Sequence, residues 1–131
     1  MLPLWDEGPA FGKTPSDPGE SVTFKVAMLL PGPMDDMSWN STGYQGLLLI
    51  KQELGATISY IENVAEEDME MLFRNYAKEG VDLIIGHGGQ FIIPAEKVAD
   101  VFPRISFMIV GTYTGNNRNL GAVQFKQEEL G

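Results

Sequence analysis

The fold is decided by residues 23–61, TFKVAMLLPGPMDDMSWNSTGYQGLLLIKQELGATISYI. The apolar, β-rich run over residues 23–30 predicts a buried strand, and residues 57–61 predict a second one. Between them lie a loop over residues 31–39 and a helix over residues 40–54, which ends at a glycine. The apolar positions of this helix recur at helical spacing: Gly43, Leu47, Ile50 and Leu54. The segment is therefore one strand–helix–strand unit.

The same alternation continues along the chain. Further strands are predicted at residues 81–85, 105–110 and 120–125, and further helices at residues 66–78 and 94–102. The apolar stripe of each helix is clear: Met69, Leu72, Phe73 and Tyr76 in the first, Ala95, Val98, Ala99 and Phe102 in the second. Pro94 suits the first turn of its helix, and residues 127–130 would begin another helix.

Alternating apolar strands and amphipathic helices predict an α/β fold with three layers. The sheet is open and parallel, with helices on both faces and the strand order 2-1-3-4-5 of a doubly wound fold. We expect residues 22–131 to form this domain. Residues 1–21 are expected to be an extended tail, because their prolines and glycines disfavour a helix or a central strand.

Composition excludes several classes of protein. The 131 residues suit one domain, and 44% of them are hydrophobic, which argues against disorder. The chain has no cysteine and one histidine, so disulfides, cysteine zinc sites and multi-histidine metal sites are excluded. A net charge of −9 argues against binding nucleic acid through its phosphates. No apolar run is long enough to span a membrane.

The first twenty residues contain neither a complete phosphate-binding loop nor a secretory signal peptide. The stretch GPAFGKT at residues 8–14 resembles a phosphate-binding loop, but it is one residue short and no apolar strand precedes it. The tail has neither the basic nor the apolar region of a secretory signal peptide. Its apolar side chains could dock on a surface of the domain: Leu2, Leu4, Trp5 and Phe11.

A ligand is expected beyond the carboxyl ends of the strands, near the reversal of strand order. The loops there are residues 31–40, 63–66, 86–91 and 111–117. In the first loop, Trp39 at the start of a helix can stack on a flat ligand, or it can pack as core. Asp35 and Asp36 can be helix-entry acids, ligand acceptors, a metal pair or an acid–base dyad, and the helix-entry role is the simplest. The sequon Asn40-Ser41-Thr42 is short enough to be a chance match.

The loop over residues 86–91, GHGGQF, combines glycines with the single histidine. The glycines let a ligand approach the backbone. His87 can be a base, a metal ligand or a hydrogen-bond donor to a ligand, and the alternative is a loop residue bonded to backbone. Tyr113 in the loop GTYTG offers an aromatic ring, and the alternative is an ordinary polar turn. Met69 and Met71 are expected to be packing residues.

Several stretches together resemble the basic membrane protein family, the substrate-binding lipoproteins of ABC importers that are related to purine-nucleoside receptors. They are KVAMLLPGPMDDMSW at residues 25–39, YIENVAE at 60–66, DLIIGHG at 82–88, KVADVFP at 97–103 and GTYT at 111–114. The likeness covers residues 23–131. It implies two α/β lobes of the type I periplasmic-binding-protein kind that close on a ligand, in proteins about twice as long. The chain would be the N-terminal lobe, with the second lobe absent.

The resemblance also implies the ligand. Family members bind purine bases, nucleosides or similar flat heterocycles, with an aromatic ring at the position of Trp39 stacked on the base. Nucleoside-binding members carry an aspartate where this chain has Leu30, and the Pro-Gly-Pro-x-Asp-x-x-x-Trp pattern resembles a branch associated with free purine bases. The predicted ligand-binding residues are Trp39, Asn40, Asp36, His87, Gly88, Phe91 and Tyr113.

The resulting hypothesis is a non-enzymatic, substrate-binding component of an ABC transporter. It would act in the cell envelope outside the cytoplasm, with a membrane permease as partner, without cofactor, metal or nucleic acid. One alternative is a regulatory, ligand-sensing or oligomerising domain, a homodimer through the face left by the missing lobe. The other alternative is a flavodoxin-like enzyme or nucleotide switch, for which Asp35 and Asp36 are the only candidate catalytic carboxylates.

Overall fold

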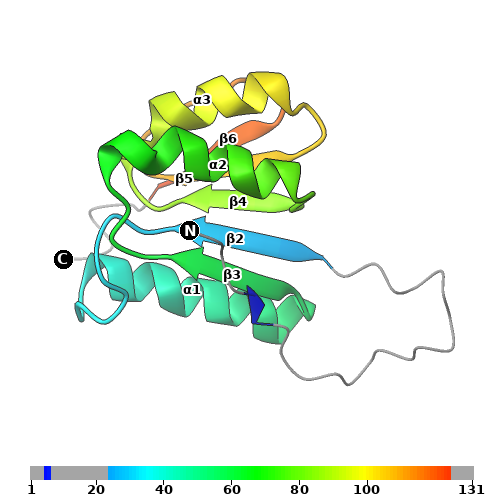
Figure 1. The fold of residues 1–131 in the computed structure, drawn as a ribbon. Coiled ribbons are helices and arrows are strands. Elements are labelled where there is room, and N and C mark those ends of the chain that lie inside the picture. Colours follow the sequence, from blue (N-terminus) through cyan, green and yellow to red (C-terminus); the bar gives the residue numbers. More distant parts are fainter. Residues whose placement is uncertain (1–4, 7–23, 125–131) are drawn as a thin grey trace, which may run out of the picture.

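The computed structural model describes residues 5–6 and 24–124 (Figure 1). The strands are β1 (Trp5–Asp6), β2 (Lys25–Leu29), β3 (Thr57–Ile61), β4 (Leu83–Gly86), β5 (Ser106–Val110) and β6 (Leu120–Val123). The helices are α1 (Trp39–Leu54), α2 (Met69–Lys78) and α3 (Ile92–Val101). Two short 3-10 segments, η2 (Glu66–Asp68) and η3 (Gly89–Phe91), precede α2 and α3. The predicted strands and helices from residue 23 to residue 123 are confirmed, with bounds that differ by three residues or fewer.

The sheet has six strands in the order β1-β3-β2-β4-β5-β6. Strands β2 to β6 pair in parallel, so the predicted order 2-1-3-4-5 is confirmed. The register aligns Leu29 at the end of β2 with Ile61 of β3 and with Gly86 of β4. The segments that follow these strands therefore leave the sheet at one common edge.

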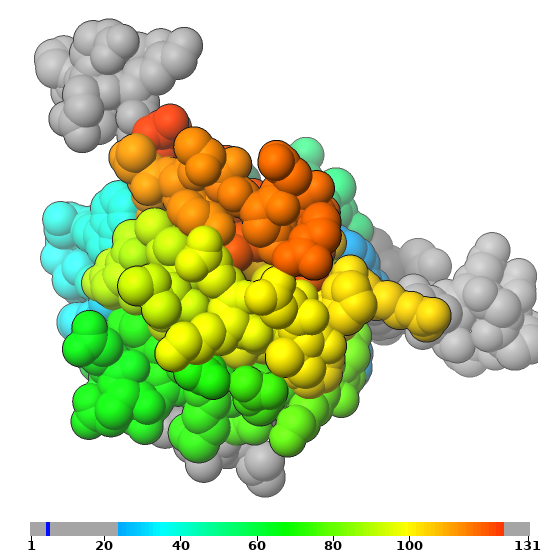
Figure 2. Space-filling model, turned by 90° about the horizontal axis from the view of Figure 1, so that it is seen from above, coloured from blue at the N-terminus to red at the C-terminus, as the bar shows by residue number. Residues whose placement is uncertain are grey.

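Helices cover both faces of the sheet (Figure 1). Helix α1 lies on one face, and α2 and α3 lie together on the other, which Figure 2 shows from outside. The central strand β2 alternates between two cores: Ala27 and Leu29 pack toward α2 and α3, whereas Val26 and Met28 pack toward α1. Every residue of β2 after Lys25 is buried, as is typical of a parallel strand covered on both sides.

The apolar stripes predicted for α2 and α3 are largely buried in the structure. The predicted inward residues of α2 are all buried, and so are the alanines and the valine of the α3 stripe, while Phe102 is partly buried. Two predictions are wrong. Leu54 is 66% exposed at the last position of α1, beyond the reach of the sheet, and Met71 is 50% exposed because it lies off the buried stripe of α2.

The strand β1 is a short antiparallel addition to the edge of β3. Trp5 packs edge-on against Tyr76 with ring centroids 5.8 Å apart, and its indole N–H donates to Glu79 at 3.1 Å. The Lys25 ammonium lies 5.5 Å from the centre of the same ring. The tail therefore docks through Trp5, as expected. Leu2, Leu4, Phe11, the stretch at residues 8–14 and residues 127–130 lie outside the described residues.

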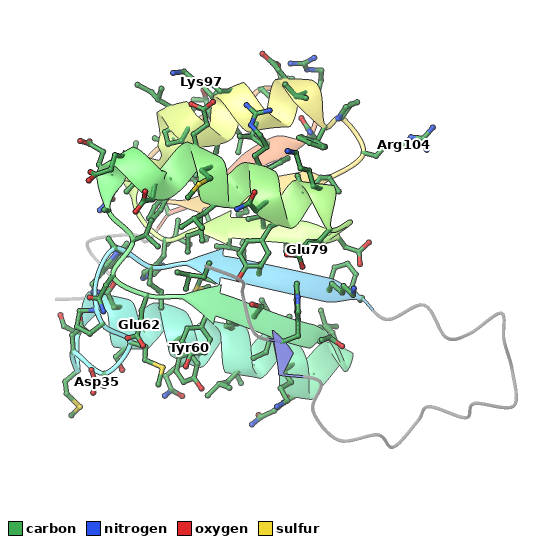
Figure 3. The ribbon with its side chains drawn as sticks, in the orientation of Figure 1. Asp35, Tyr60, Glu62, Glu79, Lys97 and Arg104 are labelled. Atoms are coloured by element: carbon green, nitrogen blue, oxygen red, sulfur yellow. The ribbon has the colours of Figure 1, made fainter. Side chains whose placement is uncertain are left out.

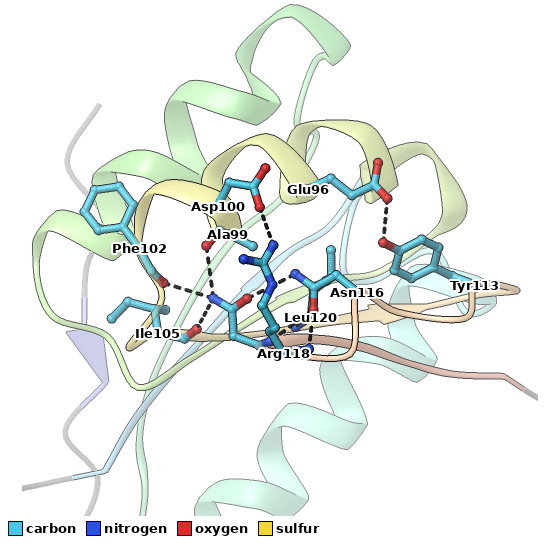
Figure 4. A network of polar contacts seen from close by, with 10 residues as sticks. Glu96, Ala99, Asp100, Phe102, Ile105, Tyr113, Asn116, Arg118 and Leu120 are labelled. Atoms are coloured by element: carbon cyan, nitrogen blue, oxygen red, sulfur yellow. Dashed lines mark hydrogen bonds and ion pairs between the residues drawn. The ribbon is translucent and has the colours of Figure 1, made fainter.

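The connection from β5 to β6 has no helix, although the two strands are parallel. Two asparagines hold it (Figure 4). The side-chain oxygen of Asn116 accepts hydrogen bonds from the backbone N–H groups of Arg118, Asn119 and Leu120. The side-chain amide of Asn119 lies within hydrogen-bond distance of carbonyl oxygens in the last turn of α3 and just after it: Ala99, Phe102 and Ile105. This network ties the connection to the end of α3.

Candidate functional site

The edge at which the parallel strands end holds the candidate site. Strand β2 continues into α1 on one face, whereas β4 continues into α3 on the other face (Figure 1). Neighbouring strands whose connections diverge in this way leave a crevice between them, where ligands bind in open parallel sheets. The loop after β2 and residues 87–88 after β4 flank this point.

Trp39 and His87 meet there. Their rings are stacked, with centroids 4.1 Å apart and an angle of 21° between the planes. The indole N–H of Trp39 donates to the carbonyl oxygen of His87 at 3.1 Å, and His87 Nε2 lies 2.7 Å from the carbonyl oxygen of Trp39. Trp39 is 37% exposed and His87 only 2%. Trp39 thus presents part of its ring to solvent, and His87 lies beneath it.

The loop before α1 is organised by Asp36. One carboxylate oxygen accepts from the backbone N–H groups of Ser38 and Ser41, and the other accepts from the backbone and side-chain nitrogens of Asn40. Asp36 therefore satisfies N–H groups in the first turn of α1 that have no partner within the helix. This confirms the helix-entry role for Asp36, and its acceptor positions are occupied within the loop.

Two more contacts fix the same loop. Asn40 is buried, and its side-chain oxygen accepts from the backbone N–H of Gly32 at 3.1 Å. The carboxylate of Glu62, just after β3, accepts from the backbone N–H of Met34 at 2.9 Å. Figure 3 shows Glu62 at the same end of the molecule as Asp35. Sequence reasoning missed Glu62, whose only signal was its place directly after a strand.

Burial alone would raise the pKa of the Asp36 carboxyl, but the hydrogen bonds from Ser41, Ser38 and Asn40 outweigh it and lower the pKa to about 2. Because the folded pKa lies below the unfolded value, the ionised form stabilises the fold above about pH 4, and that contribution is lost as the pH falls toward about 2.

We therefore expect Asp36→Asn to lower the melting temperature at neutral pH and to have a smaller effect near pH 2. Thermal unfolding followed by circular dichroism measures both, and an equal effect at both pH values would contradict the assignment.

Glycines bring the loops of this edge close together. A Cβ on Gly43 of α1 would lie 2.7 to 2.9 Å from ring atoms of His87, so only glycine lets the helix approach the ring. A Cβ on Gly111 would lie 3.3 Å from the backbone nitrogen of Gly89, which places the loop after β5 against the loop after β4. Gly88 has φ +143°, and a Cβ there would overlap the side chain of Gln90.

Four of the predicted site residues make contacts within the chain itself. Phe91 is fully buried and packs edge-on against Phe73, so it belongs to the core and faces away from the edge. His87 is bonded to backbone, as the simpler interpretation held, and Asn40 and Asp36 hold the loop. These side chains are enclosed or occupied because the elements they join are packed tightly, which the sequence pattern did not reveal.

Tyr113 packs against the core on the α3 side of the sheet and points toward Glu96 (Figure 4). Its hydroxyl donates to Glu96 of α3 at 2.6 Å. Desolvation is the main cause that raises the pKa of Tyr113, to about 12, and the hydrogen bond to Glu96 adds to it. The phenol is therefore neutral and engaged with α3.

The described residues hold neither a cluster of metal-ligating side chains nor a helix that could cross a membrane. Within residues 5–6 and 24–124, no three histidine, aspartate or glutamate side chains converge to hold a metal ion. None of the helices described here is long and apolar enough to cross a membrane.

Comparison with known proteins agrees with the fold. The Bmp family, described as ABC transporter substrate-binding protein PnrA-like, matches residues 23–131. Transcriptional activator protein med of Bacillus subtilis is 32% identical over 108 residues, which are 82% of this chain and 34% of that protein. An uncharacterized lipoprotein of Pyrococcus horikoshii is 34% identical over 115 residues, 86% of this chain and 28% of that protein.

Among solved structures, an ABC transporter solute-binding protein from Aeropyrum pernix K1 superimposes with a TM-score of 0.73 at 24% identity. The match covers 82% of this chain and 30% of that chain. The chain thus spans about a third of the length of these relatives, less than the half that was expected.

Proposed function

The chain belongs to the Bmp family of PnrA-like ABC transporter substrate-binding proteins, and from this we propose that it forms one lobe of a binding site for a purine base, a nucleoside or a similar flat heterocycle. The observation that carries the proposal is Trp39. The residue is 37% exposed at the carboxyl edge of the sheet, and its indole is held in one orientation by His87. A large, oriented aromatic ring at the reversal of strand order is what a flat ligand needs in order to stack.

The other contributions come from backbone and loop groups. Of the glycines after β4, Gly88 is buried beneath the side chain of Gln90, whereas Gly89 is exposed and can let a ligand approach its backbone. In this proposal the loop before α1 is held by Asp36 and Asn40, and the Trp39 indole is held by His87. Tyr113 lies at the margin of the proposed site. In two-lobed members of this kind, a second lobe would close on the exposed side of Trp39.

The rest of the proposal concerns the whole protein. Relatives named as solute-binding proteins and lipoproteins support a place in the cell envelope outside the cytoplasm, with a membrane permease as partner. Binding without turnover follows the description of the family. No metal or cofactor is part of the proposed mechanism.

Tryptophan fluorescence tests the ligand class. In a Trp5→Phe background, Trp39 is the only tryptophan, so its emission reports on the site alone. We expect adenine or guanosine to change the emission saturably, with a Kd of about 0.1–1 mM because one lobe supplies only part of the contacts. Titrations with cytidine and riboflavin serve as comparisons. An unchanged emission across all four compounds would rule out the proposed ligands.

A matched variant separates stacking from other contacts. Trp39→Ala removes the ring, and aromatic stacking on a base contributes about 1–3 kcal/mol, so purine affinity should fall about 5- to 150-fold. Calorimetry measures this without relying on the tryptophan. Thr112→Ala, at an exposed position of the loop after β5, is the control and should bind as the unaltered chain does.

A second candidate function is a ligand-sensing regulatory domain. It is favoured by the relative named a transcriptional activator. With a net charge of −9, such a domain would act through protein contacts and not by holding nucleic acid phosphates. Sedimentation distinguishes its dimeric form, since a strict monomer at all concentrations would count against oligomerisation as the means of regulation.

A further inference from the structure

The Trp39–His87 pair contains more than a stacking contact. A carbonyl oxygen only accepts hydrogen bonds, so the 2.7 Å contact to the Trp39 carbonyl places a proton on His87 Nε2. The indole N–H of Trp39 in turn donates to the carbonyl of His87. Each residue therefore donates from its ring to the backbone of the other. The two hydrogen bonds and the ring stack together define one orientation of the indole.

The second ring nitrogen of His87 has a different environment. Nδ1 is buried and has no hydrogen-bond partner among the described residues. In a neutral ring that carries its proton on Nε2, Nδ1 is a bare acceptor, and a buried acceptor without a partner costs free energy. A phenyl ring would stack on Trp39 without that cost. What the imidazole has and a phenyl lacks is a donor for the Trp39 carbonyl and a site that can take up a proton.

Little space surrounds the ring. Trp39 covers one side, and the backbone of α1 at Gly43 approaches ring atoms so closely that a Cβ would lie within 2.9 Å of them. Three neighbours of the ring have no titratable side chain: Trp39 and Gly43 of α1, and Leu29 of β2, whose carbonyl accepts from the backbone N–H of His87. The charged group that acts on the ring is the Asp36 carboxylate in the loop before α1. A proton on Nδ1 would thus introduce an N–H without an acceptor into a closed space.

We propose that His87 is the positioning residue of Trp39, that its neutral form sets the orientation of the indole for ligand stacking, and that protonation on the buried Nδ1 loosens the pair and weakens ligand binding in acid. Burial, the main influence, lowers the pKa of His87, while the hydrogen bond to Trp39 and the charge of Asp36 partly offset it. The ring is therefore neutral near pH 7. The inference rests on the proposed function, because Trp39 is the stacking platform there.

The first experiment needs no ligand. His87 is the only histidine of the chain, so its ring resonances are assigned without further work. In the Trp5→Phe chain we expect ¹⁵N chemical shifts to show the Nε2–H tautomer at about pH 8. As the pH is lowered from about 8 through the titration of His87, the indole N–H resonance of Trp39 should follow the ring. A Trp39 resonance that stays constant while His87 titrates, or an Nδ1–H tautomer, would overturn the inference.

The second experiment measures ligand affinity in three chains. In the unaltered chain, adenine or guanosine affinity should fall about fivefold or more between about pH 8 and the acid side of the His87 titration seen by NMR. His87→Gln keeps a donor for the Trp39 carbonyl but does not titrate, so its affinity should be nearly independent of pH. His87→Phe keeps an aromatic ring but lacks the donor, and it should bind more weakly than His87→Gln at about pH 8. Circular dichroism establishes that both variants are folded.

The two proposals fail in different ways. If Trp39 follows His87 without ligand but no purine binds at any pH, the proposed function fails and the positioning role stands. If purines bind with the same pH dependence in the unaltered chain and in His87→Gln, the proposed function stands and the positioning role fails.

Discussion

Gly43→Ala is expected to lower the free energy of unfolding by about 1–3 kcal/mol, because overpacking a closed core contact costs this much. The new methyl group would lie 2.7 Å from His87 Nε2, the atom that bonds the Trp39 carbonyl. The ring cannot simply move aside, since Trp39 is stacked on it. Urea unfolding followed by circular dichroism measures the change.

Gly46→Ala in the same helix is the matched control. A Cβ on Gly46 meets no atom within 4 Å, so the substitution gains helix propensity without a clash. We expect it to raise the free energy of unfolding by about 0.5–1 kcal/mol. Changes of the same sign at both positions would show that the close approach of α1 to His87 does not constrain Gly43.

Asn119→Ala is expected to lower the free energy of unfolding by about 2–3 kcal/mol. Its side-chain amide lies within hydrogen-bond distance of three carbonyl oxygens at the end of α3 and just after it, at 2.9 to 3.1 Å (Figure 4). The substitution leaves these carbonyls without that partner and releases the crossover to β6. Chemical unfolding of the purified variant measures the loss.

The neighbouring Arg118→Ala is the control for Asn119. Arg118 pairs with Asp100 at 2.6 Å, but both side chains are about two thirds exposed. Exposed ion pairs contribute about 0–1 kcal/mol, so this variant should unfold almost as the unaltered chain does. If Arg118→Ala costs as much as Asn119→Ala, the surface ion pair and not the asparagine holds the crossover.

The strands and helices were predictable because their signals are local. The apolar run of β2 and the stripe of α2 through Leu72, Phe73 and Tyr76 each report burial through periodicity alone. Right-handed connections leave few topologies, and the strand order was expected from doubly wound folds. The short strand β1 was not predicted as a strand, because two residues carry no periodicity, although the docking of Trp5 was expected.

The sequence predicted where the candidate site lies, but it predicted less well which side chains face it. The loops at the carboxyl edge were identified correctly, and Trp39 lies there half-exposed. Phe91 was assigned to the site because it ends a glycine-rich loop, yet its ring fills the core beside Phe73. Loop position identifies the edge, but the direction of a side chain depends on what packs beside it.

By itself, the sequence of this protein determined the α/β class, the order of the parallel strands and the edge where a ligand can bind. These depend on burial patterns within short stretches and on rules that hold for all parallel sheets. Only the tertiary structure decided that His87 lies under Trp39 and against Gly43, and that Asn119 closes the end of α3. The physical reason is that these contacts join residues far apart in the chain, so their distances exist only once the sheet and helices have packed.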